Sequence, residues 1–136
     1  MSAVNNMRVL IADDSDAIAE RLAAMLADID GLEIVGRAST VLGASRAVET
    51  LKPDAMILDL QMPGGSGIDV LARMKKDGVT TPIVIVLTNY SHAQYRRKCL
   101  ESGARFFLDK STEFDRVPAV LNQLMRDASG EPRARS

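Results

Sequence analysis

Short apolar runs alternate with longer amphipathic stretches along this chain. The stretch after the first run repeats apolar residues at about 3.6-residue spacing, as expected of an α-helix with one buried face; these residues are Ile18, Leu22, Met25, Leu26 and Ile29. Five apolar runs separated by such stretches predict an α/β fold, a doubly wound five-stranded parallel sheet with helices on both faces. The runs lie near residues 7–12, 32–38, 55–59, 83–88 and 105–109.

Capping and breaking residues predict where the helices begin and end. Gly31 fits the C-terminal stop of the first helix. The segment 66–69 has the form of a capping box that opens the third helix, and 91–94 is expected to open the fourth in the same way, with Gly103 after its end. Pro118 lacks a backbone donor and fits the first turn of the last helix.

Composition is ordinary for a folded domain. The 136 residues, 46% hydrophobic and 26% charged, fit one domain, and we expect a short N-terminal segment at 1–6, the folded domain at 7–128 and a disordered tail at 129–136. The net charge of -1 favours neither nucleic-acid nor membrane binding. The lone Cys99 and the lack of a signal-like or membrane-length apolar segment indicate a cytoplasmic protein.

Polar residues directly follow four of the five apolar runs. In doubly wound sheets the carboxyl ends of the strands form the ligand crevice, so these residues are expected to meet at one edge. Carboxylates about 5 Å apart repel by roughly 3 kcal/mol at an effective dielectric of about 20, so the cluster needs a cation or a retained proton. Mg²⁺ suits it, because this ion prefers oxygen ligands and shares them with phosphate. The residues are Asp13, Asp14, Asp59, Thr88 and Lys110.

At these positions the chain resembles the receiver domains of bacterial two-component response regulators. The matching segments are Asp13-Asp14, the stretch 58–67 (Leu-Asp-Leu-Gln-Met-Pro-Gly-Gly-Ser-Gly), Leu87-Thr88 and Asp109-Lys110, in that order. The resemblance covers roughly residues 7 to 126. It implies a flavodoxin-like strand order, 2-1-3-4-5, and a stand-alone receiver, since no effector region follows the fifth helix.

The resemblance also implies a chemistry for the site. Asp59 would accept a phosphoryl group from a sensor histidine kinase, a histidine phosphotransfer protein or a small phosphodonor. Asp14, Asp59 and the backbone carbonyl of Gln61 would hold Mg²⁺, for which Mn²⁺ can substitute, with Asp13 acting largely through water. Lys110 would pair with a phosphoryl oxygen. Thr88 would bind another and draw its loop inward. Such a protein is a switch that catalyses only its own phosphorylation and dephosphorylation, rather than an enzyme.

Readout is expected on the face formed by the fourth helix, the fifth strand and the fifth helix. In this family the readout includes an aromatic residue three positions before the lysine, here Phe107, which has no hydroxyl, so we expect it to couple through packing alone. Arg96, Arg97 and Lys98 would contact an unknown downstream protein. The resemblance places Tyr90 and Gln61 at two positions that in this family flank the path of the hydrolytic water, so we expect Tyr90 to slow autodephosphorylation.

Two departures from the family pattern stand near the site. Ser111 occupies a position where many relatives have proline, commonly with a cis bond. Asn89 stands where a small residue is usual, and we expect it to narrow phosphoryl access.

Other functions fit parts of the pattern. On the same fold, the protein would be a phosphorelay shuttle or a scaffold that works unphosphorylated. A haloacid dehalogenase-type phosphatase also forms an aspartyl phosphate, but it places a second aspartate two residues after the nucleophile, where this chain has Gln61. A flavodoxin-like electron carrier is opposed by the acidic segment 13–16, which would repel a flavin phosphate, and by the lack of tryptophan.

Overall fold

The computed structural model describes residues 6–128, and the predictions for residues 1–5 and 129–136 lie outside this range. Its centre is a five-stranded parallel sheet with the strand order β2-β1-β3-β6-β7. Numbered within the sheet, this is the expected order 2-1-3-4-5. The strands are β1 (Met7–Ala12), β2 (Leu32–Ala38), β3 (Ala55–Leu58), β6 (Ile83–Thr88) and β7 (Phe106–Asp109).

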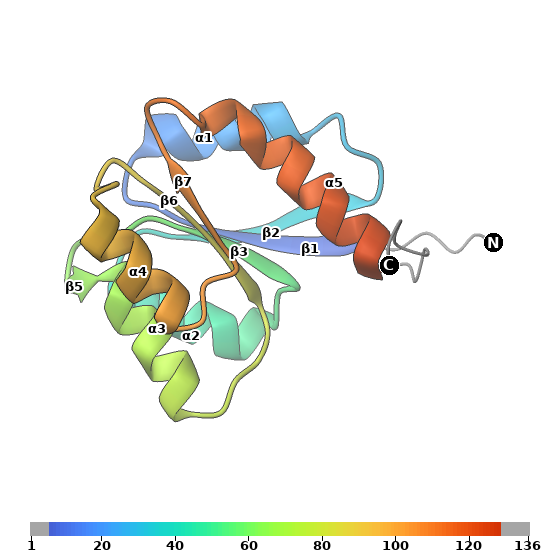
Figure 1. Cartoon of the computed structure of the whole chain (residues 1–136). Helices are drawn as coiled ribbons and strands as arrows, with labels where there is room; N and C mark the ends of the chain where they lie inside the picture. Colours follow the sequence, from blue (N-terminus) through green and yellow to red (C-terminus); the bar gives the residue numbers. More distant parts are fainter. Residues whose placement is uncertain (1–5, 129–136) are drawn as a thin grey trace.

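Helices cover both faces of the sheet, so the sheet is doubly wound as predicted (Figure 1). One face carries α1 (Asp16–Leu26), the short 3₁₀ turn η1 (Phe114–Arg116) and α5 (Val117–Ala128). The other carries α2 (Val41–Leu51), α3 (Gly67–Lys76) and α4 (Ala93–Glu101). The sequence did not predict the small antiparallel hairpin of β4 (Gln61–Met62) and β5 (Gly65–Ser66), which links β3 to α3.

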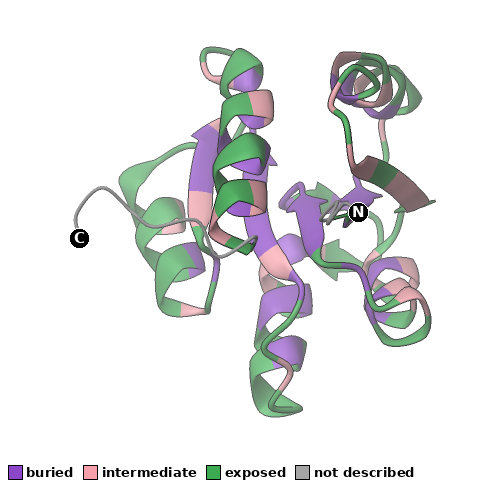
Figure 2. Cartoon of the chain, turned by 90° about the vertical axis from the view of Figure 1, so that its right-hand side faces the viewer, coloured by how far each residue is buried: buried purple, intermediate pink, exposed green. Residues whose placement is uncertain are grey.

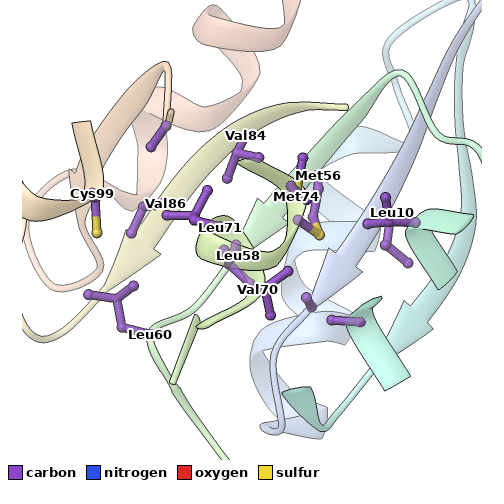
Figure 3. Packing of buried hydrophobic residues seen from close by; sticks show 14 of the residues in the cluster. Leu10, Met56, Leu58, Leu60, Val70, Leu71, Met74, Val84, Val86 and Cys99 are labelled. Atoms are coloured by element: carbon purple, nitrogen blue, oxygen red, sulfur yellow. The ribbon is translucent and has the colours of Figure 1, made fainter. Parts of the chain in front are cut away.

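The alternation of side chains along each strand supplies two separate cores. In β1, Val9 packs toward α1 and α5, whereas Leu10 packs toward α2 and α3. Figure 2 shows the buried strands enclosed by helices whose inner faces are also buried. Figure 3 shows Leu71 of α3 and Cys99 of α4 in the core that also contains Leu10. Because the three central strands are buried on both faces, their carboxyl ends are held in fixed register.

Three helix ends were predicted correctly. Gly103 directly follows Ser102, the C-cap of α4, and has φ of 110°. Ser66 and Asp69 form the reciprocal capping box at the start of α3. Pro118 is the second residue of α5, where its missing N–H is not needed. The 3₁₀ turn η1 ends at Arg116, directly before α5.

Two other helix ends were predicted wrongly. α1 ends at Leu26, and Gly31 instead lies in the following turn with φ of 82°, where its carbonyl accepts a hydrogen bond from Met7 N at 2.6 Å. The segment after Leu26 is rich in aspartate and glycine, which are poor helix formers, so the helix stops early.

The predicted capping box of α4 does not form either. His92 occupies the cap position, and within the described residues its side chain makes no cap bond. Ser91 hydrogen-bonds Asp109 instead, and this bond is the main cause that lowers the pKa of the Asp109 carboxyl. A contact across the sheet edge therefore replaces the local cap.

Within residues 6–128, no helix combines the length and the apolar character that crossing a bilayer requires.

Candidate functional site

The strand register brings the polar residues after the runs to one edge of the sheet. Ala12 pairs with Leu58, and Leu58 pairs with Val86, so Asp13 and Asp59 follow neighbouring strands at the same level. Both carboxylates are buried, as is Thr88. The predicted convergence of chemistry-bearing residues is therefore present.

Lys110 bridges the two buried carboxylates. Its Nζ lies 2.8 Å from Asp13 Oδ2 and 3.1 Å from Asp59 Oδ2. Burial alone would lower the pKa of Lys110, but the hydrogen bonds and charges of Asp13 and Asp59 outweigh burial and raise it. The side chain therefore carries a full positive charge at neutral pH, only 10% exposed.

Asp59 is fixed by its own backbone and by a close neighbour. Asp59 N donates to Ala12 O at 2.9 Å, and Gln61 N donates to Asp59 Oδ1 at 3.3 Å. Gly67, the first residue of α3, packs so tightly that a Cβ there would lie 2.4 Å from Asp59 O. The sequence predicts Gly67 only as part of the capping-box segment 66–69 and of the stretch 58–67, because a contact between chain segments leaves no signal in a single sequence.

Asp13 is held on several sides. Its backbone N donates to Ala38 O at 2.9 Å, and its Oδ1 accepts from Ser15 N at 2.8 Å. Arg37 Nη2 donates to Asp13 O at 3.1 Å. Sequence reasoning missed Arg37, which lies in an edge strand and resembles an ordinary surface cation.

The acidic side chains fit a divalent cation of the magnesium type. Asp13, Asp14 and Asp59 each offer an oxygen, and these atoms lie within 4.8 Å of one another. Opposed ligands of an octahedral Mg²⁺ ion are about 4.2 Å apart, so small side-chain rotations suffice. Asp14 is exposed while the other two are buried, which leaves an open side for water and a phosphoryl group. Gln61, whose carbonyl was predicted to complete the set, is the exposed first residue of β4, two positions after Asp59.

A family model described as the response regulator receiver domain matches residues 9–122. The chain belongs to this family. A response regulatory protein of Vibrio cholerae is 33% identical over 120 residues, covering 88% of this chain and 49% of that protein. The transcriptional regulatory protein YhcZ of Bacillus subtilis is 37% identical over 107 residues, covering 79% and 50%. The chain thus spans about half the length of these relatives.

Solved structures agree with the assignment. The response regulator domain of CheB from Thermotoga maritima is 27% identical with a TM-score of 0.77, covering 94% of this chain and 99% of that one. The receiver domain of a putative Luxo repressor protein from Vibrio parahaemolyticus is 28% identical with a TM-score of 0.82, covering 93% and 95%. The chain is therefore a receiver domain and not a member of the phosphatase or flavodoxin classes weighed above.

In this receiver domain the loops after β6 and β7 are tied together beside the site. Lys110 N donates to Thr88 O at 2.8 Å, and Ser111 Oγ donates to Asn89 Oδ1 at 3.1 Å. Thr88 Oγ1 accepts from Tyr90 N at 3.1 Å. A ligand that moves the Thr88 hydroxyl therefore acts on the β6–α4 loop through the bond to Tyr90 N. The expected effect of Asn89 on phosphoryl access stays a prediction.

The predicted readout residues form two groups. Phe107 is buried in β7 beneath Arg96 of α4, whose Nη1 donates to Phe107 O at 3.2 Å and whose guanidinium carbon lies 5.7 Å from the ring centroid. Tyr90 is 41% exposed and stacks on Tyr95 with a centroid distance of 5.9 Å. The remaining two, Arg97 and Lys98, are exposed on α4.

Proposed function

We propose that the domain is a phosphorylation-dependent switch that accepts a phosphoryl group on Asp59. The observation that carries the proposal is the bridge from Lys110 to Asp59 and Asp13 inside a cluster of three carboxylates. A structural ion pair needs one partner, whereas this site gathers acids in excess of the one ammonium that holds them. Such an excess is suited to a divalent cation and an incoming phosphoryl group.

In the proposed reaction, an Asp59 carboxylate oxygen attacks the phosphorus of the donor. A P–O bond forms to Asp59, and the P–N bond of a phosphohistidine, or the P–O bond of a small acyl phosphate, breaks with its electron pair leaving on the donor. Asp13, Asp14, Asp59 and the Gln61 carbonyl would hold Mg²⁺, or Mn²⁺ in its place. The ion would supply neutralisation of the charge on the transferred group.

The residues around Asp59 then detect the product. Lys110 would exchange its contact with the Asp59 carboxylate for one with a phosphoryl oxygen. Thr88 would donate its hydroxyl proton to another oxygen, and its Oγ1 can still accept from Tyr90 N, because a hydroxyl donates and accepts at once. Moving a two-state equilibrium from 1:99 to 99:1 requires about 5.5 kcal/mol of differential interaction, and two charge-assisted hydrogen bonds can provide much of it.

Partners follow from the same proposal. The donor would be a sensor histidine kinase or a histidine phosphotransfer protein in the cytoplasm. A downstream protein would bind α4, β7 and α5. A related solved structure is titled a CheX-CheY-BeF3-Mg complex from Borrelia burgdorferi; its matched chain is 27% identical with a TM-score of 0.71, covering 85% of this chain and 89% of that one. The absence of direct nucleic-acid binding stays a prediction from the net charge.

The experiment compares the unmodified protein with Asp59→Asn. Each is incubated with acetyl phosphate, with and without Mg²⁺, and the intact mass is measured. We expect an increase of one phosphoryl group that requires both Asp59 and Mg²⁺. An unchanged mass for the unmodified protein, together with an unchanged NMR spectrum when beryllofluoride is added, would contradict the proposal. Transfer from the phosphorylated domain to a phosphotransfer protein would favour a relay role over a terminal switch.

A further inference from the structure

Arg37, near the end of β2, contacts the first acidic segment at two points. Its Nη2 donates to Asp13 O at 3.1 Å, and its Nη1 pairs with the carboxylate of Asp16. The next residue of β2 holds the opposite side of the same residue, because Asp13 N donates to Ala38 O at 2.9 Å. Both main-chain polar groups of Asp13 are therefore bound to β2.

These contacts enclose the segment that carries the predicted metal ligands. Asp14 lies between Asp13, which β2 holds, and Ser15, whose hydroxyl caps α1 by accepting from Ile18 N at 3.2 Å. Asp16 is the first residue of α1. The guanidinium thus joins the end of a strand, the acidic turn and the start of a helix, which its planar fork of donors allows and a lysine ammonium does not.

Global stability does not explain this arrangement. The Asp16 side chain is 82% exposed and that of Arg37 is 33% exposed, and exposed ion pairs contribute little to stability. The hydrogen bond to Asp13 O instead fixes where the Asp13 and Asp14 carboxylates can point. Cation affinity depends on this kind of prior ordering, since ligands that must be ordered on binding lose part of the binding free energy.

We propose that Arg37 is a positioning residue that holds the Asp13–Asp14 segment in the arrangement that binds the divalent cation. The inference rests on the proposed function, because it concerns the same site. A positive charge near a cation weakens binding by repulsion, so removing Arg37 would strengthen Mg²⁺ binding if Arg37 acted through its charge. If Arg37 instead positions the segment, its removal should weaken Mg²⁺ binding.

The test measures the Mg²⁺ dissociation constant of the full chain by calorimetry. Arg37→Met removes both contacts, and Arg37→Lys keeps the charge but loses the fork. We expect both to weaken binding by about tenfold, the smaller end of the range seen when groups behind metal ligands are changed. Arg46→Met, which removes an exposed arginine of α2, should leave the constant unchanged.

A second measurement separates positioning from general damage. The Mg²⁺ concentration for half-maximal phosphorylation by acetyl phosphate should rise in both Arg37 variants, while the rate at saturating Mg²⁺ stays near that of the unmodified protein. Asp16→Asn keeps the bond to Asp13 and should show a smaller loss, with no additional loss when combined with Arg37→Met.

Unchanged or tighter Mg²⁺ binding in Arg37→Lys and Arg37→Met would overturn the inference while leaving the proposed function intact. If Arg37→Met does not fold, as judged by circular dichroism, the lysine and Asp16 variants decide. If the unmodified protein binds no Mg²⁺, the proposed function itself fails, and the inference fails with it.

Discussion

At the scale of single residues, Lys110 determines the charge balance of the site. Its ammonium offsets part of the repulsion between Asp13 and Asp59 at distances of 2.8 and 3.1 Å. A divalent cation would bind the same carboxylates. Lys110 and the cation therefore neutralise the same acidic cluster, so the presence of one should reduce the stabilisation that the other provides.

Replacing Lys110 with methionine tests this relation. In EDTA we expect Lys110→Met to lower the free energy of unfolding by about 3 kcal/mol, because two buried carboxylates lose their partner. Mg²⁺ should restore more stability to this variant than it adds to the unmodified protein. Urea unfolding with and without 10 mM Mg²⁺ measures both effects. Lys98→Met, at an exposed position of α4, is the control and should change little.

Tyr90 lies beside Thr88 and stacks on Tyr95. We expect Tyr90→Ala to shorten the lifetime of the phosphorylated domain severalfold, because the ring no longer shields the phosphoryl group from water. Tyr90→Phe keeps the ring and should keep the lifetime. The decay of phosphorylated protein after removal of the donor, followed by intact mass, gives the rates. Equal lifetimes for the alanine variant and the unmodified protein would show that the ring does not restrict water.

At the scale of elements, the helices hold the site by close packing against strand ends. α3 begins at Gly67, against the carbonyl of Asp59, so a shift of this helix moves Asp59 directly. α4 begins without a side-chain cap from His92 and carries Arg96 over Phe107. The start of α3 is therefore rigidly placed, and the start of α4 is the one suited to move.

Gly67→Ala should damage both stability and chemistry. The added Cβ would lie 2.4 Å from Asp59 O and 3.1 Å from Leu58 Cγ, so α3 or Asp59 must shift. We expect a loss of about 3 kcal/mol in the free energy of unfolding and slower phosphorylation by acetyl phosphate. Gly78→Ala, where a Cβ meets nothing within 4 Å, should lose only about 1 kcal/mol from its positive φ and phosphorylate normally. Normal phosphorylation of Gly67→Ala would contradict the role given to this contact.

Cys99 gives a reporter for the packing of α4. Burial raises the pKa of its thiol from 9.0 to about 11, so at pH 8 the thiolate is roughly a hundredfold scarcer than in the unfolded chain. We expect iodoacetamide to label the native protein at least a hundredfold more slowly than the protein in urea. The same pKa shift makes stability depend on pH. Above pH 9 the thiol ionises in the unfolded chain before it ionises in the native protein, so the stability contributed by the buried, neutral thiol declines between pH 9 and about 11. The Cys99→Ala variant should lack that decline in stability. Rapid labelling of the native protein by iodoacetamide would show that α4 opens often.

At the scale of the whole molecule, the sequence predicts the sheet and most of the site for one physical reason. Strands buried on both faces appear as short apolar runs, and a parallel sheet collects the residues that follow those runs at one edge. Asp13, Asp59, Thr88 and Lys110 were found because each comes directly after a run. Their identity as a site did not depend on any contact that only a structure can show.

The features that escaped prediction depend on contacts between distant segments. Arg37 and Gly67 act on residues more than five positions away in the chain, and nothing in their own neighbourhood distinguishes them. Ser91 was predicted to cap α4, but its side chain hydrogen-bonds Asp109 instead. Gly31 was placed at a helix end that lies several residues earlier. Local patterns therefore predict elements well and the choice between competing partners poorly.

The bridge between Asp13 and Lys110 joins residues 97 positions apart in the chain. It links the residue after β1 with the residue after β7, which are the first and last strands of the described sheet in chain order. A nascent or partly folded chain that lacks β7 has gathered the acids without their ammonium, so its unfinished state carries a local excess of negative charge. Cation binding with native affinity should therefore appear late in refolding, so that the acidic site reports when the domain is complete.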